Sequence, residues 1–174
     1  MTSAQEHAAL TRAAAAAPEV MRVVTLRLED ELFAIEAARV REILDLTPIT
    51  RVPNASNFAG ALINVRGAVV PLADFRVMFG MDRRSPNEDT RIVVIEVDIG
   101  GEAVIVGLMA DKVHDVTDIA MGSVEAAPKV GMRWPAGLIR GIGQHGGEFI
   151  VIPDLDRIFA TYGGTGQVPD EGRP

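Results

Sequence analysis

The chain has 174 residues, of which 48% are hydrophobic and 24% charged, and its formal net charge is -7. These values are typical of a globular protein, and the length suffices for one compact domain or two small half-domains. The absence of cysteine excludes disulfides, thiol nucleophiles and cysteine-rich zinc sites. An acidic surface repels phosphate backbones and anionic lipids, so we expect no nucleic-acid binding. No apolar run is long enough for a membrane span, so we expect no membrane insertion.

The N-terminal part of the chain predicts a tail followed by a β-hairpin. Residues 1–20 are rich in alanine and lack an apolar stripe, so we expect a flexible N-terminal tail there, with an ordered domain over residues 21–162. Residues 24–28 alternate apolar and polar side chains, which is typical of a strand, and a polar turn leads to a second strand at residues 32–35. Residues 37–46 predict a short helical turn and then a strand.

A second hairpin and a short helix are expected next. The apolar runs at 60–65 and 68–72 are divided by Arg66-Gly67, and glycine adopts the positive φ that a tight turn requires. Residues 73–79 then predict a short helix. The charged loop that follows contains the densest basic patch of the chain, Arg83-Arg84, which acidic residues flank. We interpret it as a solvated loop.

The remainder of the chain is rich in β-branched residues and glycine. Strands are expected in the following segments: 92–99, 103–109, 113–119, 137–143 and 149–152. A long loop spans residues 125–135, a second short helix is predicted over residues 154–160, and we expect a flexible C-terminal tail over residues 163–174. About ten short strands bounded by glycine and proline indicate a mainly β fold of the barrel or sandwich type.

The two predicted helices share a pattern that indicates internal duplication. Residues 74–79 and 154–159 both begin with aspartate and a large apolar residue and both end with phenylalanine. A hairpin precedes each of them. This echo favours two similar sub-barrels over one large barrel. Asp74 and Asp154 are interpreted as helix caps rather than as a catalytic carboxylate pair.

No set of residues in the sequence has the pattern of a catalytic site. The three histidines, His7, His114 and His145, lack the spacing of metal ligands, and neighbouring His114 and Asp115 point to opposite faces of a strand. Residues 141–146 match the dinucleotide-binding glycine pattern, but a strand follows them instead of the helix that would hold a pyrophosphate. We therefore expect a protein that is not an enzyme and that uses neither a metal nor a cofactor.

Several segments resemble, in order, the motifs of the CheW family of chemotaxis coupling proteins. The resemblance covers about residues 21 to 162. The matching segments are Val40-Arg41-Glu42-Ile43, Gly60-Ala61-Leu62-Ile63-Asn64-Val65-Arg66-Gly67, Val70-Pro71-Leu72-Ala73-Asp74-Phe75-Arg76 and Asp111-Lys112-Val113-His114-Asp115-Val116. The signature leucine of the family is replaced by Val65, and the Asp-Leu-Arg motif reads Asp-Phe-Arg here.

The resemblance implies a fold and a function. The family's fold is two packed five-stranded SH3-like β-barrels with a few short helices. Its members link the cytoplasmic tip of chemoreceptors to the regulatory domain of the histidine kinase CheA, and they are cytoplasmic proteins recruited to receptor arrays at the inner membrane. An alternative is a related coupler that serves pili or surface sensing, and a more distant one is an SH3-like module that binds a small ligand.

The resemblance also implies residues for receptor binding. They are Arg66, Val40, Glu42, Gly60, Val113 and Gly141. Each has a structural alternative. Arg66 suits an ion pair or a turn cap, Val40 and Val113 suit core packing, and the two glycines suit tight backbone geometry.

Overall fold

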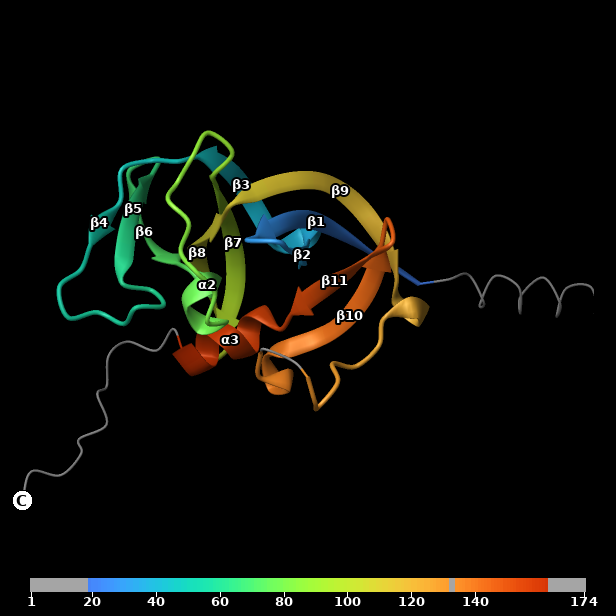
Figure 1. The fold of residues 1–174 in the computed structure, drawn as a ribbon. Coiled ribbons are helices and arrows are strands. Elements are labelled where there is room, and N and C mark those ends of the chain that lie inside the picture. Colours follow the sequence, from blue (N-terminus) through green and yellow to red (C-terminus); the bar gives the residue numbers. More distant parts are fainter. Residues whose placement is uncertain (1–18, 132–133, 163–174) are drawn as a thin grey trace, which may run out of the picture.

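The computed structural model describes residues 19–131 and 134–162, which form two curled sheets packed side by side (Figure 1). The five-stranded sheet has the order β10-β11-β2-β1-β9, and the six-stranded sheet has the order β3-β7-β8-β6-β5-β4. The strands of the first sheet are β1 (Val20–Leu28), β2 (Glu31–Glu36), β9 (Lys112–Ala120), β10 (Ile139–His145) and β11 (Glu148–Pro153). Those of the second are β3 (Val40–Asp45), β4 (Thr50–Arg51), β5 (Ala61–Val65), β6 (Ala68–Ala73), β7 (Arg91–Ile99) and β8 (Glu102–Ala110).

The predicted mainly β class and the division into two sheets are confirmed. We call the first sheet the terminal barrel, because its strands come from both ends of the described chain, and the second sheet the central barrel. The sixth strand of the central barrel, β4, has two residues and was not predicted. The first strand begins at Val20, one residue before the predicted start of the domain. The predicted tails otherwise lie outside the described residues.

The two barrels have the same strand arrangement. Order β9-β1-β2-β11-β10 in the terminal barrel corresponds to order β3-β7-β8-β6-β5 in the central barrel. The third pairing in each of these orders, β11 with β2 and β6 with β8, is parallel, and a helix follows β11 and β6 along the chain. These helices are α3 (Leu155–Tyr162) and α2 (Phe75–Met78). The predicted echo between residues 74–79 and 154–159 therefore marks equivalent places, although the repeats are circularly permuted rather than successive halves of the chain.

Both predicted helix caps are present. Asp74 Oδ1 accepts a hydrogen bond from the backbone N–H of Arg76 at 3.0 Å, and Asp154 Oδ1 accepts one from that of Arg157 at 3.2 Å. Carboxylates at these positions satisfy N–H groups that the first turn leaves free. The interpretation of the two aspartates as caps is confirmed.

The largest hydrophobic core lies between the barrels, because strands of both sheets are buried on both faces. On β1, Met21 and Val23 belong to the core inside the terminal barrel, whereas Leu26 and Leu28 belong to the core that the barrels share. The alternation follows from the period of two of a strand. Aromatic rings cross the boundary, with Phe33 of β2 stacked on Phe79 at a centroid distance of 5.5 Å. This shared core fixes the barrels as neighbours.

The chain crosses between the barrels at two described places, and the first is the helical turn η1 (Ala37–Arg39), between β2 and β3. Arg39 donates from Nη1 to Oδ1 of Asp156 and from Nη2 to Oδ2, at 2.7 Å each. Asp156 lies on α3 and also accepts a hydrogen bond from the backbone N–H of Asp98 at 2.8 Å. Paired parallel bonds of this kind are among the stronger polar contacts in proteins.

The Asp156 contacts predict how stability depends on pH. The hydrogen bonds from Arg39 hold the pKa of the Asp156 carboxyl below its ordinary value. A folded-state pKa below the unfolded one means that the unfolded chain binds more protons, so stability rises with pH. We expect this contribution to be complete above the ordinary carboxyl pKa of about 3.9 and lost as the pH falls through the depressed value. Urea unfolding at a series of acidic pH values should show a shallower loss of stability for Asp156→Asn than for the wild type. An equal loss would contradict the prediction.

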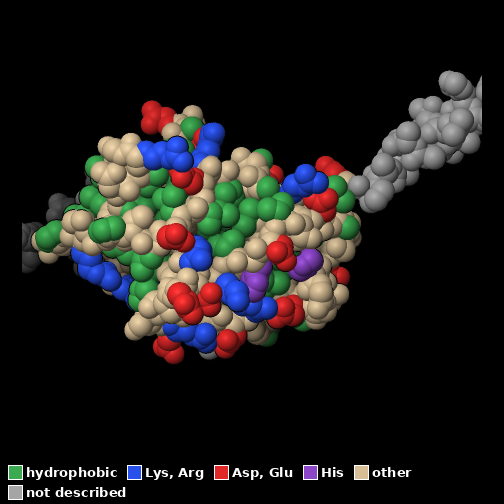
Figure 2. Space-filling model, turned by 90° about the horizontal axis from the view of Figure 1, so that it is seen from above, with side chains coloured by type: hydrophobic (Ala, Val, Ile, Leu, Met, Phe, Trp, Pro, Cys, Tyr) green, Lys and Arg blue, Asp and Glu red, His purple; other side chains and the backbone are tan. Residues whose placement is uncertain are grey.

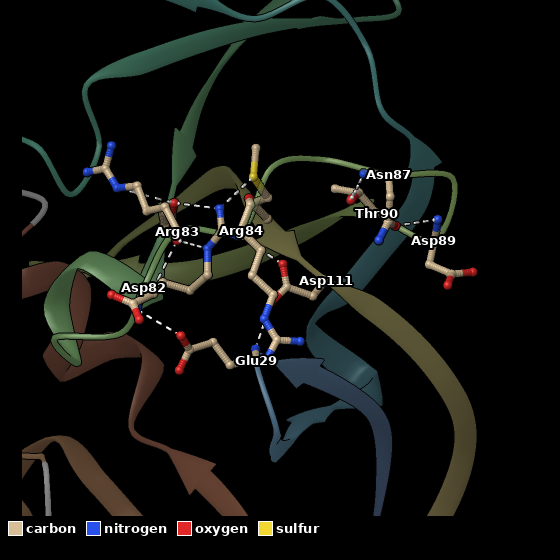
Figure 3. A network of polar contacts seen from close by, with 11 residues as sticks. Glu29, Asp82, Arg83, Arg84, Asn87, Asp89, Thr90 and Asp111 are labelled. Atoms are coloured by element: carbon tan, nitrogen blue, oxygen red, sulfur yellow. Dashed lines mark hydrogen bonds and ion pairs between the residues drawn. The ribbon is translucent and has the colours of Figure 1, made fainter.

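The second crossover is Asp111, between β8 and β9, and it belongs to a polar network (Figure 3). Arg76, whose side chain is 5% exposed, donates to Asp111 Oδ1 at 2.8 Å and binds both oxygens of Asp74 at 2.9 Å. The other oxygen of Asp111 accepts a hydrogen bond from the backbone N–H of Glu29 at 2.6 Å, in the turn between β1 and β2. The buried guanidinium thus has carboxylate partners on two elements.

The loop that contains Arg83-Arg84 is anchored to the same turn. The backbone N–H of Asp82 donates to Glu29 Oε1 at 2.8 Å (Figure 3). Arg84 pairs with Asp30 at 3.2 Å. The arginine pair is exposed, as expected for a solvated loop, but Arg84 and the backbone of Asp82 give this loop a defined contact with the terminal barrel.

Candidate functional site

The hairpin between β5 and β6 presents Arg66 at its tip. Arg66 and Gly67 both have positive φ, 53° and 86°, which is the backbone of the two-residue turn that fits the twist of a hairpin. The Oδ1 of Asn64 accepts a hydrogen bond from the backbone N–H of Gly67 at 2.9 Å and closes the turn. The predicted hairpin is confirmed. Its sequence indicated positive φ only for Gly67, so the left-handed backbone of Arg66 was missed.

The structure brings Arg66 and Glu42 together. Arg66 Nη2 lies 2.9 Å from Glu42 Oε1 on β3, a strand that is not a neighbour of β5 in the sheet. The hydrogen bond with Glu42 raises the pKa of Arg66, so the guanidinium stays charged. The Arg66 side chain is 81% exposed, whereas that of Glu42 is 28% exposed. Glu42 therefore orients an arginine that still offers most of its donors to solvent.

Exposed apolar side chains also lie on strands of the same barrel. Ile43 follows Glu42 on β3 and is 42% exposed, and Val69 follows the turn on β6 and is 69% exposed. Seen from above, the molecule shows hydrophobic side chains gathered between charged ones (Figure 2). A barrel that exposes both an arginine and apolar side chains has the composition typical of protein–protein contact sites, where arginine is enriched among the residues that dominate binding.

Val40 and Val113 lie on different barrels. Val40 begins β3, two residues before Glu42, and pairs with Ile95. Val113 lies on β9 and pairs with Leu26. Both are half-buried and pack against the core shared by the barrels. Core packing accounts for both positions, and Val40 also lies on the strand that carries Glu42.

Gly60 and Gly141 are separated from Arg66. Gly60 precedes β5 while Arg66 follows it, and Gly141 belongs to β10 in the terminal barrel. A Cβ atom at Gly60 would lie 2.4 Å from the carbonyl oxygen of Ser56, and one at Gly141 would lie 2.4 Å from Cγ1 of Val124. Only glycine permits such close approach. Tight backbone geometry thus accounts for both glycines.

The structure also tests the glycine pattern of residues 141–146 and the expected lack of a metal site. Residues 141–146 form part of β10 and of the turn before β11, so no helix opens after the glycines, and the hairpin interpretation is confirmed. Among the described residues no group of three or more histidines or carboxylates is placed to hold a metal ion. Within the same part of the chain, no helix is long and apolar enough to cross a bilayer.

A groove on the terminal barrel was not predicted from the sequence. It has a volume of about 770 Å³ and lies between the turn of β10 and β11, the turn of β1 and β2, and the loop after η2 (Met121–Ser123). Its lining includes Leu32, Trp134 and Phe149, and Phe149 is 71% exposed. The loop and the β10–β11 hairpin lie at the opposite side of the molecule from the β5–β6 hairpin (Figure 1). The central barrel therefore presents the exposed Arg66, and the terminal barrel presents this groove.

Comparisons with known proteins agree on one family. Residues 22–162 match the CheW-like domain family. The chain is 30% identical over 139 residues to the chemotaxis protein CheW of Rhizobium meliloti, covering 80% of this chain and 87% of that protein. It is 28% identical over 134 residues to the chemotaxis protein CheW of Klebsiella aerogenes, covering 77% and 78%. The crystal structure of the scaffolding protein TtCheW from Thermoanaerobacter tengcongensis superposes with a TM-score of 0.72 and 29% identity, over 83% of this chain and 90% of that one.

Proposed function

Because this chain belongs to the family of CheW-like domains, we propose that it links the cytoplasmic tip of chemoreceptors to the regulatory domain of a CheA-type histidine kinase. The family membership confirms the predictions of two SH3-like barrels, of a chemotaxis scaffold and of a protein without enzymatic chemistry. The further step, to the two named partners and to a place at receptor arrays on the cytoplasmic side of the inner membrane, is our proposal.

The exposed Arg66, oriented by Glu42, is the observation that supports receptor binding. Its guanidinium has donors left after one bond to Glu42 Oε1 at 2.9 Å, and they match carboxylate or carbonyl oxygens on a helical hairpin. Exposed Ile43 and Val69, on β3 and β6 of the same barrel, would supply apolar contact area. Charge complementarity would set orientation and association rate, while burial of the apolar side chains would supply affinity.

An adaptor also requires a second surface for the kinase. The terminal barrel supports this requirement, because it carries an apolar groove away from Arg66, with exposed Phe149 at its edge. Two surfaces on two packed barrels would let one partner bind without displacing the other.

A bridging assay tests the proposal. An immobilised receptor-tip fragment is expected to retain the kinase regulatory domain when this protein is added and not when it is omitted. Competition with free receptor tip should release the kinase domain. Equal retention of the kinase domain with and without this protein would contradict the proposal. So would a protein that, tested with one partner at a time, binds neither of them.

A further inference from the structure

Each crossover between the barrels is held by one carboxylate. At the first crossover, Asp156 of the terminal barrel binds Arg39 with both oxygens and accepts the backbone N–H of Asp98 from the central barrel at 2.8 Å. At the second, Asp111 binds Arg76 of the central barrel at 2.8 Å and accepts the backbone N–H of Glu29 from the terminal barrel at 2.6 Å. We call these two sets of contacts the Asp156 clamp and the Asp111 clamp.

The clamps are equivalent in composition as well as in place. Each consists of a carboxylate, one arginine guanidinium and one backbone N–H, and each joins an element of one barrel to an element of the other. In the Asp156 clamp, the arginine (Arg39) lies at the crossover and the carboxylate lies on α3. In the Asp111 clamp, the carboxylate lies at the crossover and the arginine (Arg76) lies on α2. Two such contacts at separate crossovers restrain rotation of one barrel against the other more than a single contact could.

The clamps add a directional restraint to that of the shared core. Hydrophobic contact is non-directional, so packed apolar faces tolerate small sliding movements. Hydrogen bonds to a carboxylate are directional, and paired guanidinium contacts add geometric specificity. The core therefore holds the barrels together, while the clamps add directional contacts at both crossovers.

We propose that Asp111 and Asp156 are positioning residues that fix the angle between the barrels, and so fix the receptor-facing surface relative to the kinase-facing one. The second half of this statement rests on the proposed function. Coupling requires that binding at one site is transmitted to the other through the protein. A joint of fixed angle between the barrels would provide this connection.

The joint can be tested without any partner. The chain has no cysteine, so spin labels at Thr50→Cys in the central barrel and Gln144→Cys in the terminal barrel report one inter-barrel distance. We expect a narrow distance distribution in this parent and a broader one when Asp111→Asn and Asp156→Asn are combined. The matched control is Asp118→Asn, which removes an exposed pair with Arg22 inside the terminal barrel and should leave the distribution narrow. A narrow distribution in the combined variant would overturn the proposal.

A binding experiment tests the functional half. With wild-type protein, a bound receptor tip is expected to raise affinity for the kinase regulatory domain by about fivefold or more. The combined variant should bind each partner alone within about twofold of the wild type but lose this cooperativity. Retained cooperativity with a broadened distance distribution would overturn the positioning role. If wild-type protein binds neither partner, the proposed function fails, and the distance measurement still decides on the clamps.

Single variants keep the test decisive if the combined variant does not fold. Asp156→Asn and Arg39→Gln remove the same clamp from its two sides, so both should broaden the distance distribution to a similar extent. A folded single variant whose distribution and cooperativity both match the wild type would show that its clamp does not set the angle.

Discussion

Replacing Asp74 with alanine is expected to lower the free energy of unfolding by about 3–5 kcal/mol, because it leaves a buried guanidinium short of its main partner. Arg76 is 5% exposed and binds both oxygens of Asp74, while Asp111 accepts only one of its hydrogen bonds. The substitution also removes the cap of α2. Urea unfolding at neutral pH measures the change.

Asp154→Ala is the matched control for this experiment. Asp154 caps α3 at the equivalent place of the terminal barrel, and within the described residues it has no ion pair. Loss of a cap alone costs about 1 kcal/mol. Equal destabilisation by the two substitutions would show that the buried Arg76 does not depend on Asp74.

Replacing Arg66 with glutamate is expected to weaken receptor-tip binding by at least about tenfold while leaving the thermal unfolding midpoint unchanged. The side chain is 81% exposed, so its ion pair with Glu42 contributes little to folding, whereas a partner carboxylate would now meet a like charge. Titration of the immobilised receptor fragment measures the affinity.

A charge swap separates binding from structure at this position. Combining Arg66→Glu with Glu42→Arg restores the ion pair between β3 and the β5–β6 turn in reverse. If Arg66 contacts the receptor, the double variant stays deficient in binding. If the pair merely stabilises the hairpin, binding recovers, and that recovery would contradict the assignment of Arg66 to the receptor surface.

Local features of the fold could be predicted from the sequence because their determinants are close together along the chain. The alternation in residues 24–28 and 32–35 defines β1 and β2, and Arg66-Gly67 defines the turn between β5 and β6. The two capping aspartates precede apolar helical turns in both barrels. Each of these signals depends on neighbours within a few residues.

Contacts between distant residues could not be predicted in the same way. Arg66 and Glu42 are 24 residues apart, and Glu29 and Asp111 are 82 apart, so no local pattern relates the members of either pair. The groove beside Phe149 likewise arises from three separate segments. Family resemblance placed Arg66 and Glu42 in one set, but only the fold shows that one orients the other. For Gly60 and Gly141, the fold supplies a packing reason instead.

The way the barrels divide the chain has a consequence for protein synthesis. The central barrel is continuous from Val40 to Ala110, so it can close as soon as this stretch has left the ribosome. The terminal barrel cannot, because Leu32 on β2 pairs with Ile150 on β11, near the end of the described chain. The β1–β2 hairpin emerges before the other described strands, but the sheet to which it belongs is completed last. Its apolar faces therefore remain uncovered for most of translation. Molecular chaperones that recognise exposed apolar strands would therefore meet this hairpin first.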